Sequence, residues 1–154
     1  MTKSAGFVAV LLLAACSGGA GPAPAKPSTS ATGTVEGFMQ AVADSNLAKM
    51  AMLWGTAKGP AAQTNDPPDW ERRIAIIRSY LRNEAFRIGS DTPDGEAHHA
   101  VQVELRRETC TWIVPFSVIK LADGTWIVNQ VDLAAAGNPM RPCQEATPED
   151  TTAR

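Results

Sequence analysis

The hydrophobic pattern of this chain changes its period near Ala85, and this change constrains the fold more than any other feature. Up to Leu81, large apolar residues recur three and four positions apart, which is typical of amphipathic helices. From Ala85 onwards, apolar and polar residues alternate, which is typical of strands with one buried face. We therefore expect one α+β domain in which the helices precede an antiparallel sheet.

Three helices are predicted in the first half of the chain. Their expected ranges are 35–43, 47–54 and 70–81. Their expected N-caps are Gly33 or Thr34, then Asp44 to Asn46, then Asp66 or Asp69. Gly55 is expected to end the second helix. In the third helix, Ile76 and Tyr80 widen the apolar face. Residues 55–68 are rich in Gly, Pro and Asn, so a long loop is expected there, which could act as a lid or rim.

Four strands are predicted in the second half. Their expected ranges are 85–88, 98–106, 110–121 and 125–133. The pair Asp123-Gly124 is a strong signal for a hairpin turn between the last two strands. Pro115 has no N–H to donate, so its nitrogen must face a sheet edge or a bulge. This proline leaves the register of the last two strands open.

Residues 1–16, MTKSAGFVAVLLLAAC, combine a basic Lys3 with ten apolar residues, a run too short to span a membrane. The ending Leu-Ala-Ala-Cys resembles the lipobox of bacterial lipoproteins. The resemblance implies cleavage before Cys16 and transfer of a diacylglycerol to its sulfur, so that Cys16 becomes the acylated first residue and carries chains such as palmitate. Ser17 follows instead of Asp, which implies the outer membrane, facing the periplasm, in a Gram-negative host. In a Gram-positive host it implies the outer face of the cell membrane. The alternative is an ordinary secretory signal.

The predicted domain organisation follows from these boundaries. A signal peptide is expected at 1–15, an acylated Cys with a Gly/Pro/Ser tether at 16–33, the folded domain at 34–144 and a disordered tail at 145–154. The tether contains no large apolar side chain, so it cannot bury enough surface to offset its ordering entropy.

Two segments, VEGFMQAVADSNLAKMAMLWG and LADGTWIVNQVDL, are similar to the opening helix pair and the closing hairpin of the nuclear transport factor 2-like superfamily. The resemblance covers about residues 34–134. It implies a cone-shaped α+β domain, in which three helices pack on a curved four-stranded antiparallel sheet and leave a pocket at the wide end. Members include ketosteroid isomerases, dehydratases, polyketide cyclases and accessory domains, so the fold does not fix one activity. The isomerase pattern needs a tyrosine in the first helix, and residues 34–53 contain none.

The candidate site residues are few. The weak acid or base candidates are His99, Tyr80 and Asp132, and the pocket candidates are Trp54, Tyr80, His99 and Asn129. Desolvation in an apolar pocket would shift the pKa of such a group toward neutrality. Each has a structural alternative: a histidine at the rim, a tyrosine in the core, or an aspartate facing solvent.

No metal or cofactor is expected. His98 and His99 point to opposite faces of a regular strand, so they cannot chelate one ion together. No glycine-rich phosphate loop or Ser/His/Asp grouping occurs in the sequence. A net charge of −2 gives no footprint for nucleic acid.

Five arginines crowd the third helix and its exit: Arg72, Arg73, Arg78, Arg82 and Arg87. One interpretation is a surface for an anionic partner or a lipid headgroup. The other is a solvated face that Glu71 and Glu84 balance.

A disulfide between Cys110 and Cys143 is predicted from the hairpin register. Pairing Leu121 with Thr125 sets Cys110 opposite about Ala136, and the seven residues that follow can return to it. Acylation of Cys16 would leave these two thiols in an oxidising compartment, where pairing is expected. The alternative is two free thiols.

The sequence thus favours a membrane-anchored extracytoplasmic lipoprotein whose domain binds a small apolar ligand or an envelope protein without catalysis. The alternatives are an acid/base enzyme of the isomerase, dehydratase or cyclase type, and a purely structural lipoprotein. The oligomeric state is open, and a dimer is compatible with the sequence.

Overall fold

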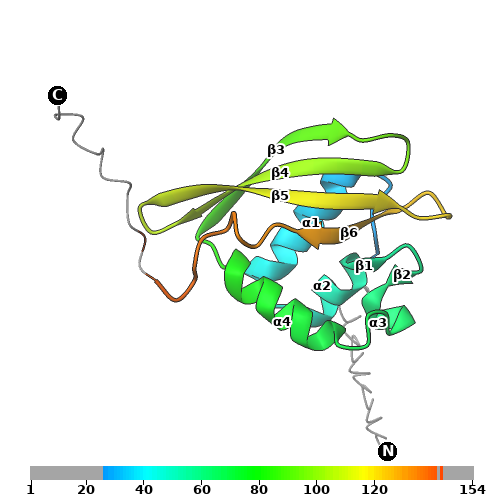
Figure 1. Cartoon of the computed structure of the whole chain (residues 1–154), viewed down its shortest axis with the longest axis horizontal. Coiled ribbons are helices and arrows are strands. Elements are labelled where there is room, and N and C mark those ends of the chain that lie inside the picture. Colours follow the sequence, from blue (N-terminus) through cyan, green and yellow to red (C-terminus); the bar gives the residue numbers. More distant parts are fainter. Residues whose placement is uncertain (1–25, 142, 144–154) are drawn as a thin grey trace, which may run out of the picture.

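The computed structural model describes residues 26–141 and 143. Their elements, in chain order, are α1 (Ala31–Ala43), α2 (Leu47–Leu53), β1 (Gly55–Thr56), β2 (Gly59–Pro60), α3 (Ala61–Thr64), α4 (Trp70–Leu81), β3 (Ala85–Pro93), β4 (His98–Arg107), β5 (Cys110–Lys120) and β6 (Trp126–Val131). Figure 1 shows a twisted sheet of β3 to β6 on one side and the helices on the other. The prediction of an α+β fold with a four-stranded antiparallel sheet is confirmed.

The large sheet is a meander in the order β3-β4-β5-β6, so each strand pairs with the next one in the sequence. The alternation predicted for β4 is confirmed, because Val101, Val103 and Leu105 are fully buried on the face that packs against the helices. The turn between β5 and β6 forms where Asp123-Gly124 predicts it, and the Leu121 amide donates to the Thr125 carbonyl at 2.7 Å.

Pro115 occupies a position that needs no amide hydrogen. Its carbonyl accepts a hydrogen bond from the Asp132 amide at 3.0 Å, just beyond the last β5–β6 pair, Phe116 and Val131. In a strand, the nitrogen and carbonyl of one residue point to the same side. The nitrogen of Pro115, which has no hydrogen to donate, therefore faces the end of β6, where no strand partner needs it. A register shift between Ser117 and Val118 lies two residues away.

The core lies between the two layers, and α1 fills much of it. Val35, Phe38 and Met39 on α1 are fully buried, in the helical spacing that the sequence predicts. Phe38 meets Phe116 of β5 edge to face, with ring centroids 6.1 Å apart. Each such side chain stabilises the fold by roughly 1.5–3 kcal/mol through burial.

The structure corrects the predicted start of the domain. Helix α1 begins at Ala31, and its cap is Ser30, whose hydroxyl accepts from the Gly33 amide at 3.1 Å. The predicted caps, Gly33 and Thr34, lie inside the helix. Thr34 is buried and its hydroxyl donates to the Trp126 carbonyl at 3.0 Å. The folded domain therefore includes the last residues of the predicted tether.

Within the described part of the chain the number of helices is four and not three, because residues 55–68 are not a plain loop. They form the hairpin β1–β2 and the one-turn helix α3. Elements of two to four residues are too short for a hydrophobic period to predict them. The second helix also ends one residue earlier than expected, because Trp54 is extended and bridges Val128 of β6 in parallel.

Two strand predictions are wrong in length. Strand β3 continues to Pro93, past the predicted end at residue 88, because it pairs with β4 across a bulge between Ile88 and Asp91. Strand β6 covers only Trp126–Val131, shorter than the predicted 125–133. In α4, Ile74, Ile77 and Leu81 are buried as predicted, but Ile76 is 41% exposed.

Candidate functional site

The candidate site is a groove between α4 and β6, with a volume of about 360 Å³. Its apolar lining residues are Trp54, Ile76, Ile77, Val131 and Leu133, and its polar ones are Arg73, Asn129 and Gln130. A mainly apolar hollow of this size with a few polar groups is typical of sites for small ligands. We name it the α4–β6 groove.

The wall of the groove on α4 arises from the geometry of the helix. Ile77 belongs to the buried stripe and forms the floor, whereas Ile76 lies one position aside and stays 41% exposed. Neighbouring residues on a helix differ by about 100° in direction, so two adjacent isoleucines can serve the core and a groove separately. The sequence predicts that Ile76 belongs to the apolar face of the helix. Because its side chain is in fact partly exposed, it forms an apolar wall of the groove.

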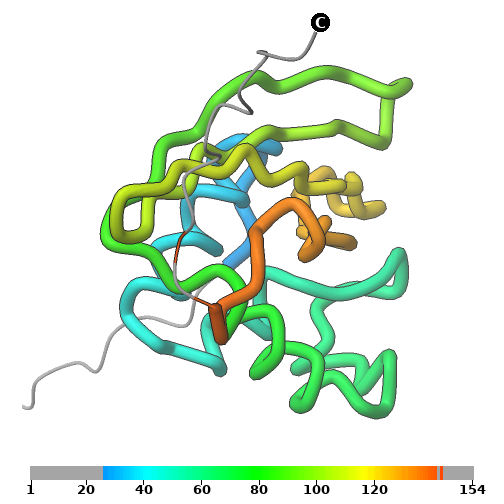
Figure 2. Tube along the Cα trace, turned by 60° about the vertical axis from the view of Figure 1, so that its left-hand side comes forward, coloured from blue at the N-terminus to red at the C-terminus, as the bar shows by residue number. Residues whose placement is uncertain are grey.

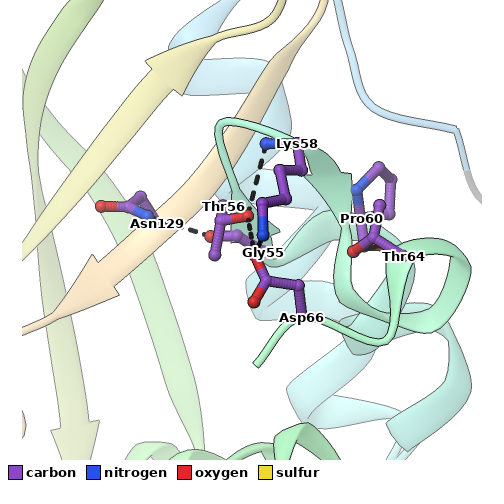
Figure 3. A network of polar contacts seen from close by, with 7 residues as sticks. All are labelled: Gly55, Thr56, Lys58, Pro60, Thr64, Asp66 and Asn129. Atoms are coloured by element: carbon purple, nitrogen blue, oxygen red, sulfur yellow. Dashed lines mark hydrogen bonds and ion pairs between the residues drawn. The ribbon is translucent and has the colours of Figure 1, made fainter. Parts of the chain in front are cut away.

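The opposite wall depends on the contact between β6 and the segment after α2. The Asn129 side-chain amide donates to the Gly55 carbonyl at 3.0 Å, as Figure 3 shows. The parallel bridge between Trp54 and Val128 lies next to it. A Cβ on Gly55 would lie 2.2 Å from the Gly59 carbonyl oxygen, so only glycine fits at this approach. The two pocket candidates Trp54 and Asn129 therefore line the same groove.

Arg73 supplies the positive charge at this groove. Its Nε donates to an Asp69 carboxylate oxygen at 2.8 Å, one helical turn earlier, and both side chains are about half exposed. This hydrogen bond from Arg73 lowers the pKa of Asp69 below its ordinary value. Within residues 26–141 and 143, no hydrogen bond occupies the two terminal nitrogens of Arg73, so they can meet an anionic or carbonyl group of a ligand.

His99 does not reach this groove. Its Nδ1 lies 2.7 Å from an Asp91 carboxylate oxygen, and its ring packs on Trp126 with centroids 4.4 Å apart. The two side chains are only 20% and 29% exposed, respectively. His99 thus shares the inward phase of β4, as predicted, but its partner Asp91 comes from the part of β3 that the sequence does not predict as strand.

Tyr80 and Asp132 are also apart from the α4–β6 groove and from each other. Tyr80 lines a second groove near the end of α4. Asp132 is exposed, and its carboxylate accepts from the Ala134 and Ala135 amides at 3.1 and 3.3 Å. Asp132 therefore stabilises the turn after β6, and the solvent-facing alternative describes it best.

A polar cluster beside the groove, drawn in Figure 3, was not predicted from the sequence. The Thr56 hydroxyl donates to Asp66 at 2.9 Å, and the Lys58 ammonium lies 3.3 Å from the same carboxylate. The Thr56 hydrogen bond and then Lys58 lower the pKa of Asp66. These contacts tie the β1–β2 hairpin to the segment between α3 and α4, so they position the Gly55 backbone that holds Asn129.

The C-terminal segment folds back along the end of α4 (Figure 2). Arg107 donates to the carbonyls of Tyr80, Arg82 and Ala136 at 3.1, 3.3 and 3.0 Å, and its guanidinium lies 4.6 Å from the centre of the Trp112 ring. Cys110 and Cys143 form the disulfide that the sequence predicts, with Cα atoms 5.9 Å apart. The segment after β6 is therefore held at two points.

The predictions of a lipid anchor and of no metal site can be compared only with the residues that the structure describes. Cys16 and the residues of the signal segment and most of the tether lie outside the described residues. Among the described residues, no group of three or more His, Cys, Asp or Glu side chains is arranged to hold a metal ion. In the same part of the chain, none of the helices has the length and apolar character to span a bilayer.

Comparison with known proteins returns no relative: no family model, curated protein or solved structure matches the chain.

Proposed function

We propose that this chain is a lipid-anchored extracytoplasmic lipoprotein, and that its folded domain binds a small, mainly apolar molecule in the α4–β6 groove. The lipobox-like ending at Cys16 supports the anchor. The groove supports the binding function. The fold we propose is of the nuclear transport factor 2-like class; its support is the order of helices before a four-stranded meander and the packing of α1 on one face of that meander.

The observation that carries the binding function is the composition of the groove. Five of its eight lining residues are apolar, and they come from three separate segments of the chain. Ile76 keeps 41% of its surface exposed at this wall. Covering that surface with an apolar ligand would contribute on the order of 1 kcal/mol from this residue alone. The free nitrogens of Arg73 and the Gln130 side chain would orient a polar end of the ligand.

Binding is favoured over catalysis because the acid and base candidates do not converge. His99 pairs with Asp91 where β4 begins, whereas Tyr80 lies at the far end of α4 and Asp132 stabilises a turn. General acid–base chemistry needs such groups within hydrogen-bond reach of one reacting molecule. The α4–β6 groove contains none of the three.

A dye titration with a matched control tests the groove. The full chain is titrated with 1-anilinonaphthalene-8-sulfonate, an anionic aromatic dye. The variant Ile76→Asp places a carboxylate on the apolar wall, and the control Leu47→Asp makes the same change at a leucine that is 40% exposed on α2. We expect saturable binding that Ile76→Asp weakens at least about tenfold and Leu47→Asp changes less than about twofold. Equal losses in both variants, or no binding by the unsubstituted chain, would contradict the proposal.

The anchor has its own test, which is independent of the groove. Labelled palmitate should enter the chain in a bacterial host and should not enter the Cys16→Ala variant. On fractionation, the unsubstituted chain should be found with the membrane and the Cys16→Ala variant in the soluble extracytoplasmic fraction. Equal labelling of both proteins would show that Cys16 is not the acylated residue.

A further inference from the structure

A second groove, of about 330 Å³, lies between the last turns of α4 and the C-terminal segment. Arg78, Tyr80 and Arg82 line it from the helix side, and Asn138 and Met140 line it from the segment after β6. It shares no residue with the α4–β6 groove. The disulfide and Arg107 hold the second wall in place, so this groove is a built feature of the fold.

The two arginines of this groove carry uncompensated charge. They lie four residues apart, which brings their side chains to the same side of α4. Within residues 26–141 and 143, no carboxylate lies within ion-pair distance of Arg78 or Arg82. Glu71 and Glu84, which the solvated-face interpretation names as the balancing charges, form no direct ion pair with either arginine.

Arg78 is also short of hydrogen-bond partners. One terminal nitrogen donates to the Ser45 hydroxyl at 2.7 Å, a neutral group in the turn between α1 and α2. Its Nε is buried and has no partner among the described residues. A partly buried guanidinium without a carboxylate is costly unless another anion compensates its charge.

The backbone at the end of α4 does not provide that compensation. The carbonyls of Tyr80 and Arg82, at the negative end of the helix, already accept from Arg107. Burial lowers the pKa of Arg107, and the nearby charge of Arg82 lowers it further, which Glu108 offsets only in part. A third guanidinium thus stands close to the groove and adds to its positive potential.

From this geometry we propose that the second groove is a binding site for an oxyanion of the phosphate class. Arg78 and Arg82 would bind its oxygens by charge-assisted hydrogen bonds. Asn138 accepts from the Met140 amide at 2.9 Å through its side-chain oxygen, which leaves its NH₂ group to donate. Tyr80 adds a hydroxyl donor. Two sources present this chemistry: a free phosphate or phosphate ester, and the headgroup of a phospholipid.

The test measures binding of both sources by variants of the full chain. Sodium phosphate is titrated calorimetrically against a chloride control of equal ionic strength. Vesicles of phosphatidylglycerol are compared with vesicles of phosphatidylcholine by sedimentation, using the Cys16→Ala chain so that no acyl chain contributes. The site variants are Arg78→Gln and Arg82→Gln, and the charge control is Arg72→Gln, which removes an exposed arginine of the same helix outside the groove.

We expect saturable binding that each site variant weakens about tenfold or more, while Arg72→Gln changes it less than about twofold. Ser45→Ala removes the neutral partner of Arg78 but keeps its charge, so it should retain binding. Arg82→Gln removes a side chain that forms no hydrogen bond with the described residues, so it should keep the urea midpoint of the unsubstituted protein.

Binding of phosphate alone identifies a free phosphate as the ligand, and binding of phosphatidylglycerol vesicles alone identifies a headgroup; either result supports the site. The absence of binding in both arms overturns the proposal. So does an equal loss with Arg72→Gln, because it would show a general charge effect. Failure of this proposal and failure of the α4–β6 groove remain distinguishable, because the latter is tested by Ile76→Asp, at a residue that does not line the second groove.

Discussion

Removing the disulfide by Cys143→Ser should destabilise the domain by a predictable amount. The two cysteines are 33 residues apart, and closing a loop of this size restricts the unfolded chain by about 3–4 kcal/mol at 25 °C in the chain-entropy treatment. A domain of somewhat more than 100 ordered residues has an unfolding entropy of about 0.24 kcal/mol/K near its melting temperature. The variant should therefore melt about 12–16 °C lower.

The assay is urea unfolding of the full chain, followed by tryptophan fluorescence with and without a phosphine reductant. Reductant should lower the stability of the unsubstituted protein to that of Cys143→Ser and should leave the variant unchanged. The double variant Cys110→Ser/Cys143→Ser should match the single variant within about 0.5 kcal/mol, because both lack the same link. A loss below about 1 kcal/mol, or a further loss in the double variant, would refute the argument that loop closure is the main effect.

Three further predictions concern single residues in other contacts of the fold. Arg107→Gln should cost about 2–3 kcal/mol in urea unfolding, because three backbone carbonyls lose a charged donor; a cost under about 0.5 kcal/mol would contradict this. Gly137→Ala should lower the melting temperature, because Gly137 has φ +70° and a Cβ there would lie 2.6 Å from the Trp112 indole nitrogen; an unchanged melting temperature would contradict that close approach. The Thr56 hydroxyl and a lysine lower the pKa of Asp66 below 3.8, so its charge stabilises the fold above that pH and the contribution is lost as the pH falls through the folded pKa. Asp66→Asn should therefore show a smaller drop of the urea midpoint between about pH 5 and pH 2 than the unsubstituted protein, and an equal drop would show that Asp66 contributes little.

The sequence by itself determined the main elements of this protein. The stripes of α1 and α4 and the alternation of β4 appear in the structure with most of the predicted residues buried, Ile76 excepted, because burial on one face imposes a period of 3.6 or 2 on the chain. Asp123-Gly124 determined the last turn, and the pairing it starts continues as far as Val118 and Val128; the register then shifts between Ser117 and Val118, which the sequence left open. The pairing at this turn, the length of the segment after β6 and the oxidising compartment expected of a lipoprotein together predicted the Cys110–Cys143 pair that the structure contains.

Only the tertiary structure decided how these elements combine into sites. The α4–β6 groove takes residues from three separate segments, and its apolar wall includes Ile76, which lies beside the buried stripe of α4 and stays 41% exposed. The β1–β2 hairpin and α3 are too short to have a period, and Asn129 of β6 holds the Gly55 backbone, which lies far from it in the sequence. Asp91 became the partner of His99 through a bulge in β3. A hydrophobic period in the sequence indicates which face of a single helix or strand is buried. A groove depends on how two such elements pack and where the surface between them stays exposed, which no single element's sequence contains.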